Sequence, residues 1–102
     1  GVFEHMLIGK QKRFLQSLGM KLEPVVQIGK NGVAAPVVAS AQEALTAREL
    51  IKVRVLRNCP DTPQAAIAQL AAATEAELVQ VIGRNGLLYK PNLKKPQIVL
   101  PD

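Results

Sequence analysis

The sequence predicts a single α/β domain with a four-stranded mixed sheet, in the order α-β-α-β-α-β-β. Three observations lead to this fold class. The chain has 102 residues, which is the length of one domain. Segments with apolar residues at helical spacing alternate with short runs of β-branched residues. Only a glycine-rich turn separates the last two strand-like runs, which indicates a hairpin.

The first helix is expected at residues 7–19 and is both amphipathic and basic. Its apolar stripe consists of Leu7, Phe14, Leu15 and Leu18. Lys12 and Arg13 project away from this stripe, and Lys10 lies at its edge. Gly19 is suited to the C-terminal cap. The helix therefore presents positive charge to solvent.

A short strand, a tight turn and a second helix are expected next. Residues 24–28 read as the strand, and Gly29-Lys30-Asn31-Gly32 as the turn. The helix covers residues 35–46, with Pro36 in its first turn.

Residues 50–56 form the clearest strand in the sequence. Ile51, Val53 and Val55 point to one face, whereas Lys52 and Arg54 point to the other. The alternation predicts one buried face and one face with two adjacent positive charges.

The last part of the chain contains a helix, a hairpin and an extended tail. Thr62 caps a third helix that ends near Thr74. Strands at 77–83 and 87–90 are expected to join at Gly83-Arg84-Asn85-Gly86, where Asn-Gly is the hairpin signal. From about residue 91 the chain is expected to be extended and to dock on the domain.

Helical crossovers favour parallel pairing of the first three strands, with the fourth antiparallel. The carboxyl ends of those three strands then share one edge, where Lys30, Arg57 and Arg84 are presented together. By alternation, one sheet face holds Gln27, Lys52, Arg54, Gln80 and Lys90, together with the apolar residues Val25, Leu78 and Ile82.

The charge of the chain suits a polyanionic partner, either nucleic acid or an anionic membrane surface. There are 13 Lys and Arg against 8 Asp and Glu, so the net charge is +5. Residues 58–80 carry a formal charge of −3, so the remaining 79 residues carry +8. The third helix is therefore expected to face away from the polyanion.

Several functional classes are excluded by residue content. Cys59 is the lone cysteine, which excludes an internal disulfide and is compatible with a cytoplasmic location. The lone histidine, His5, falls in residues 1–5, which we interpret as left over from cloning before Met6. No catalytic triad, histidine-bound zinc, Walker loop or membrane span is then expected. We expect no enzyme, no cofactor and no small-molecule substrate.

The Gly29–Gly32 motif, placed between a strand and a helix, carries the most chemical information. Backbone N–H groups of such a turn favour anions, and Lys30 adds a mobile positive charge. GXXG loops of this type clamp the nucleic-acid backbone in KH domains. The alternative is a turn that merely requires glycine. Phe14 and Tyr89 are the only aromatic residues after residue 5, so an aromatic stacking sheet is not expected.

Blocks along the chain resemble a known family. They read LIGKQKRFL at 7–15, LEPVVQIGKNG at 22–32, ELIKVRVL at 49–56, ELVQVIGR at 77–84, LLYK at 87–90 and KKPQIVLP at 94–101. In this order they resemble the CRM domain (chloroplast RNA splicing and ribosome maturation), in its stand-alone bacterial YhbY-type form. The resemblance implies a single RNA-binding domain over residues 6–102, similar to the C-terminal domain of translation initiation factor three. It also implies an assembly factor associated with precursors of the large ribosomal subunit.

The resemblance assigns the RNA-contacting residues. The GXXG loop of the family falls on Gly29, Lys30, Asn31 and Gly32, and its basic first helix on Lys10, Lys12 and Arg13. Lys52, Arg54 and Arg84 extend this positive surface. The sequence departs from the family where Ala34-Ala35-Pro36 replaces a polar helix start, and where the third helix is rich in alanine and glutamine.

Two other functions stay open on the sequence alone. The chain suits a protein-interaction module whose charge serves solubility or docking to an acidic protein. The loop also fits a small-molecule phosphate-binding domain, although no catalytic or base-reading group accompanies it. For the RNA-binding interpretation, a monomer is expected.

Overall fold

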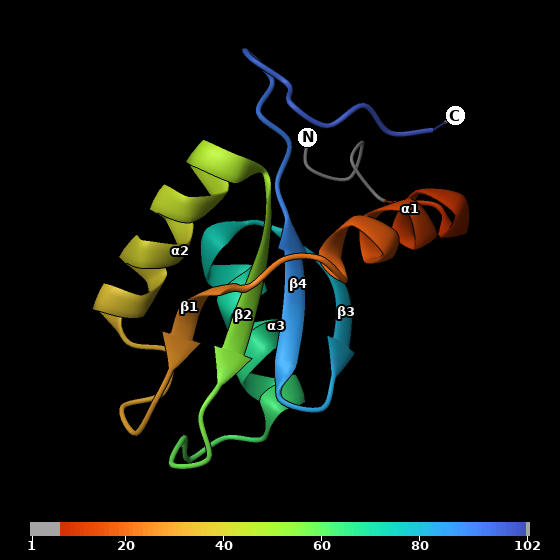
Figure 1. Cartoon of the computed structure of the whole chain (residues 1–102). Coiled ribbons are helices and arrows are strands. Elements are labelled where there is room, and N and C mark those ends of the chain that lie inside the picture. The colour runs from red at the N-terminus through yellow and green to blue at the C-terminus, as the bar shows by residue number, and fades with distance from the viewer. Residues whose placement is uncertain (1–6, 102) are drawn as a thin grey trace.

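Within residues 7–101, three helices and four strands follow one another in the predicted order (Figure 1). The computed structural model describes residues 7–101, so the expected cloning remnant at residues 1–5 lies outside the described part. The elements are α1 (Gly9–Gly19), β1 (Pro24–Ile28), α2 (Ala35–Arg48), β2 (Leu50–Val55), α3 (Pro63–Thr74), β3 (Glu77–Ile82) and β4 (Asn85–Tyr89). The predicted α/β fold with one four-stranded mixed sheet is confirmed.

The sheet has the strand order β1-β2-β4-β3. β1 and β2 are parallel, and β4 is antiparallel to both β2 and β3. Pairing β3 directly with β2 was therefore a wrong expectation, because β4 lies between them. A central position suits β4, since Leu87, Leu88 and Tyr89 are all buried and a central strand can be covered on both faces. The expected shared edge is confirmed, because β1, β2 and β3 all end at the lower edge of Figure 1.

The hairpin turn lies two residues earlier than the Asn-Gly signal predicted. Ile82 pairs with Asn85, so the turn consists of Gly83 and Arg84. Gly83 has φ +58°, a conformation that glycine adopts readily. Gly86 lies inside β4, and a Cβ there would come within 2.7 Å of the Ile67 side chain. This second glycine therefore allows β4 to approach α3 closely.

The two faces of the sheet are covered differently. α2 and α3 pack against one face, and in Figure 1 α3 lies behind the sheet and α2 at its left. The core on that side includes Ile28, Ile51, Val53, Ile67 and Leu70. On the other face, α1 and the C-terminal tail cover the upper part, around Leu15, Leu50, Val79, Leu87 and Tyr89. The lower part of this second face, near the carboxyl ends of the strands, has no helix over it.

The C-terminal tail docks as expected, and a buried carboxylate holds it. Glu49 follows α2 and is fully buried. Its carboxylate accepts hydrogen bonds from the backbone N–H groups of Asn92, Gln97 and Ile98 at 2.6, 2.7 and 2.8 Å. The side chains of Ile98 and Leu100 pack against the cluster under α1.

Three side-chain placements differ from those expected, two on the sheet and one on α1. A register shift between Leu78 and Gln80 turns Leu78 toward α3, away from the open face. Lys90 also leaves that face, because its ammonium group donates to the Thr74 carbonyl at 2.9 Å. Phe14, expected in the core, is only half buried.

Candidate nucleic-acid interface

The Gly29–Gly32 loop connects β1 to α2 at the lower edge of the sheet (Figure 1). The Gly32 N–H donates to the Gly29 carbonyl at 3.0 Å, which closes the turn. Gly32 has φ +65°, so a residue with a Cβ would be strained there. Lys30 and Asn31, at the tip, are both exposed. The loop thus presents a cation and a carboxamide on a tightly closed turn.

The start of α2, beside this loop, has no side-chain cap. Its N-cap residue is Ala34, which cannot accept a hydrogen bond through its side chain. Pro36 removes one donor from the first turn, and the Val37 N–H already donates to the Ala34 carbonyl at 3.0 Å, so this helix start attracts anions mainly through the helix dipole. The Ala-Ala-Pro departure seen in the sequence therefore leaves the positive end of the helix uncovered by a side chain.

Hydrogen bonds brace the lower edge under the loop. The Arg84 guanidinium donates through Nε to the Val55 carbonyl and through Nη2 to the Leu56 carbonyl, each at 2.8 Å. The Leu56 N–H donates to the Ile28 carbonyl at 2.9 Å. These bonds tie the hairpin to the end of β2, and β2 to the end of β1. Arg84, expected to be a contact residue, thus has its head group engaged within the protein.

A row of polar side chains crosses the open part of the sheet beside the loop. Gln27 pairs with Arg54, and Arg54 with Asn85, so the row runs from β1 across β2 to β4. Lys52 lies on the same face, one row higher. Arg54 is exposed and Lys52 is half buried. Neither side chain has an ion pair or hydrogen bond with any residue between 7 and 101.

An acidic side chain also lies near the loop. The Asp61 carboxylate oxygen Oδ2 lies 3.5 Å from the point that a Cβ on Gly32 would occupy. Asp61 belongs to the connection between β2 and α3, which passes beside the GXXG loop. This exposed carboxylate would repel a phosphate on its own side, so the loop favours an approach from the side of Lys30.

The basic residues of α1 lie apart from the loop. Lys10 and Arg13 are exposed and Lys12 is half buried. In Figure 1, α1 lies at the upper right and the loop at the lower left. The ten expected contact residues therefore form two groups on the molecule, one around the loop and lower edge and one on α1.

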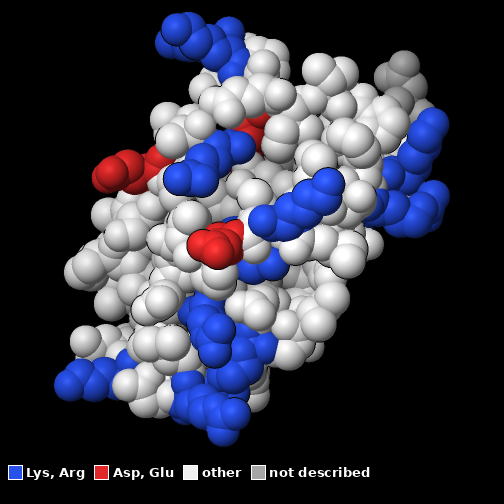
Figure 2. All heavy atoms as spheres, in the orientation of Figure 1, with Lys and Arg blue, Asp and Glu red and all other residues white. Residues whose placement is uncertain are grey.

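Two further cations lie between these groups and were missed from the sequence. Lys21 and Arg48 line a hollow of about 360 Å³ with Lys52 and Glu23. Figure 2 shows Lys and Arg side chains along the lower edge, across the middle and at the right of this face, with few acidic residues among them. Lys21 follows a helix and Arg48 ends one, so neither belongs to a pattern that marks a binding residue.

Metal-binding clusters and membrane-spanning helices are not found among the described residues. Within residues 7–101, no cluster of His, Cys, Asp and Glu could hold a metal ion. Over the same range, no helix is long and apolar enough to cross a bilayer.

Known proteins resemble this chain over almost its whole length. "Probable RNA-binding protein YqeI" of Bacillus subtilis is 46% identical over 96 residues, which are 94% of this chain and 100% of that protein. An "RNA-binding protein" of Haemophilus influenzae is 41% identical over 92 residues, covering 90% of this chain and 92% of that protein. The hypothetical protein SAV1595 of Staphylococcus aureus, whose solution structure is known, is 43% identical in sequence to this chain. It has a TM-score of 0.79 and covers 94% of this chain and 100% of that one. The CRS1/YhbY (CRM) domain model matches residues 7–90, and the chain therefore belongs to the CRM domain family.

Proposed function

We propose that this protein binds RNA through the GXXG loop and the positive surface beside it. The observation that carries the proposal is the Gly29–Gly32 turn, with Lys30 and Asn31 exposed at its tip and Gly32 at φ +65°. The names of the relatives support RNA as the ligand. Phosphate groups are the natural partners of such a loop, because its N–H groups and the start of α2 attract anions.

Each group of residues has its own role in this proposal. Gly29 and Gly32 shape the turn, while Lys30 and Asn31 contact the RNA backbone. Lys52 and Arg54 extend the contact across the sheet, and Lys10, Lys12 and Arg13 bind a more distant part of the RNA. Arg84 acts mainly by holding the lower edge together, because its Nε and Nη2 atoms donate hydrogen bonds to the carbonyl groups of Val55 and Leu56.

The RNA that we propose is ribosomal RNA in precursors of the large subunit, bound by a monomer that assists assembly in the cytoplasm. The role in large-subunit assembly rests on the family resemblance alone. It is tested by separating cell extracts on a sucrose gradient. We expect the protein with large-subunit precursors, and RNase treatment should release it. Migration with an acidic protein that survives RNase would instead support a protein-interaction module.

A charge-matched pair of variants tests the loop. Lys30→Asp with Asn31→Asp alters the loop, and Lys94→Asp with Lys95→Ser alters the exposed tail. Each pair lowers the net charge by three, so the general attraction to RNA changes equally. Fluorescence anisotropy with a ribosomal RNA fragment, at near-physiological salt, should show a much larger loss of affinity for the loop variant. Equal losses would mean diffuse attraction and would contradict the proposal.

A further inference from the structure

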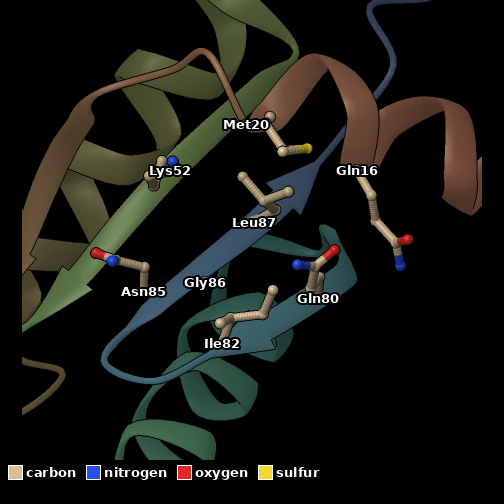
Figure 3. Close-up of a pocket in the computed structure, with 9 residues that line it drawn as sticks. Gln16, Met20, Lys52, Gln80, Ile82, Asn85, Gly86 and Leu87 are labelled. Atoms are coloured by element: carbon tan, nitrogen blue, oxygen red, sulfur yellow. The ribbon is translucent and has the colours of Figure 1, made fainter.

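A hollow on the open sheet face lies within reach of the proposed RNA path. It measures about 230 Å³ and lies below the C-terminal end of α1, over β2, β4 and β3 (Figure 3). Its lining comprises Gln16, Gly19, Met20, Lys52, Gln80, Ile82, Asn85, Gly86 and Leu87. Pockets for drug-sized ligands usually measure about 300–1,000 Å³, so this hollow suits a smaller group.

The wall formed by α1 is fixed in place by close packing. Gly19, at the end of α1, is buried against β4, and a Cβ there would overlap the Leu87 side chain. Leu87 therefore forms a firm floor. Met20 and Ile82, at opposite sides of the hollow in Figure 3, are 81% and 64% exposed. With Leu87 between them, these two side chains form an apolar centre against which an apolar face can be buried.

Three carboxamides surround this apolar centre. Those of Gln16 and Gln80 make no hydrogen bond with any residue between 7 and 101. The Asn85 Oδ1 atom is buried and also has no partner among the described residues. A buried oxygen without a donor is costly, and the terminal torsion of Asn is soft enough to let the amide turn toward a donor in the hollow. The hollow thus offers several unused donors and acceptors.

The lining also has a definite charge. Lys52 contributes a positive charge, and no Asp or Glu is among the lining residues. Arg54 lies next to Asn85 in the row that leads from β1. Because neighbouring strands lie about 4.8 Å apart, β1 and β4 are separated by about 10 Å. A single RNA strand held at the GXXG loop can cover this distance within a few nucleotides.

We propose that the hollow receives an unpaired nucleobase of the RNA that the loop binds. The proposal rests on the proposed function and adds a base-contacting site to it. The flat faces of the base lie against Met20, Ile82 and Leu87, and its edge meets the carboxamides, which present a donor and an acceptor side by side as base edges do. Lys52 neutralises the adjoining phosphate. An acidic peptide would also suit Lys52 and the carboxamides, but its acidic side chains have no flat apolar face to lie against Met20, Ile82 and Leu87.

Two serine double variants test this inference. Met20→Ser with Ile82→Ser removes the two exposed apolar side chains of the hollow, leaves Leu87 as its floor and does not change the charge. Leu93→Ser with Val99→Ser makes the same change in the tail, where the two side chains are 76% and 84% exposed. All four positions are solvent-exposed, so both variants should keep the fold, which circular dichroism checks.

The probes are a short single-stranded RNA and the same strand made abasic throughout, which keeps its phosphates. With the base-containing strand, the hollow variant should bind about 5- to 10-fold more weakly than wild type and the tail variant, which is the low end of the effect of removing an aromatic stacking partner, because aliphatic side chains contact a base less extensively. With the abasic strand, all three proteins should bind equally. Equal affinity of the two variants for the base-containing strand would overturn this inference and leave the loop proposal standing. Failure of the wild type to bind either strand would refute both.

Discussion

Replacing Glu49 by glutamine should destabilise the domain strongly, although the shape of the side chain is kept. The carboxylate is fully buried and accepts three backbone N–H groups of the tail. One oxygen, Oε1, serves Gln97 and Ile98, and the other, Oε2, serves Asn92. A glutamine keeps one oxygen, but an NH2 group replaces the other. This NH2 group cannot accept a hydrogen bond from the backbone N–H group that it faces. The tail therefore loses one hydrogen bond, and the other two lose their assistance from charge.

The size of the effect follows from these three bonds. A hydrogen bond to a charged group contributes about 1.5–3 kcal/mol, and one between neutral groups about 0.5–1.5 kcal/mol. Losing one hydrogen bond to the charged group and weakening the other two costs more than a single such bond contributes. Part of this loss is offset, because the neutral glutamine no longer requires a charge to be buried. We expect a net loss of about 2–3 kcal/mol in the free energy of unfolding. For a domain of this length, that lowers Tm by about 10–20 °C.

Urea unfolding followed by circular dichroism measures this effect. The control is Glu43→Gln, which removes the same charge from an exposed position on α2 and should change stability by less than about 0.5 kcal/mol. The midpoint should fall for Glu49→Gln at an unchanged slope. If the two variants are equally stable, the carboxylate does not hold the tail, and the reasoning is refuted.

Four further predictions concern the core, the lower edge and the loop. Burial, and secondarily the negative charge of Glu49, raises the pKa of Tyr89 in the folded protein. The folded state therefore favours the neutral phenol. The stability that this contributes is fully present below the ordinary tyrosine pKa and is lost as the pH rises through the folded-state pKa. The phenolate absorbance of this single tyrosine should titrate at higher pH in the native protein than in urea, and equal midpoints would contradict this. Gly86→Ala places a methyl group against Ile67 of α3 and should lower the free energy of unfolding by about 1–3 kcal/mol, as measured by thermal unfolding. Unchanged stability would show that the strand can shift. Arg84→Lys keeps the charge but loses the two hydrogen bonds to the carbonyl groups of Val55 and Leu56. It should lower the free energy of unfolding by about 1–2 kcal/mol and leave the salt dependence of RNA binding unchanged. Lys30→Ala should lower the slope of log affinity against log salt by about one, and an unchanged slope would remove this lysine from the contact set.

The sequence predicted the elements well because local patterns determine them. The alternation of apolar and charged residues in β2 and the Thr62-Pro63 start of α3 were both confirmed. The pairing of β3 was wrong because a hairpin can fold back on either side of its first strand. Only the burial of β4 on both faces decides between the two sides, and that is a property of the whole sheet.

The candidate site could be predicted only where one segment contains it. The GXXG motif is contiguous, so its place between a strand and a helix was correctly expected. The hollow draws on α1 and three strands, and the shift after Leu78 alters which side chains reach its face. Glu49 gave no signal, because its partners lie more than 40 residues further along the chain. Such contacts depend on the tertiary fold.

The proposed RNA surface is tested most directly by nuclear magnetic resonance of the labelled protein during addition of a ribosomal RNA fragment. At near-physiological salt, we expect the largest amide shifts at residues 29–32, with further shifts on the open face around Arg54 and Asn85. The exposed side of α3, at Ala68, Gln69 and Ala72, lies behind the sheet and should show little change. Shifts concentrated on α3, or spread evenly over all lysines including those of the tail, would contradict the proposed surface.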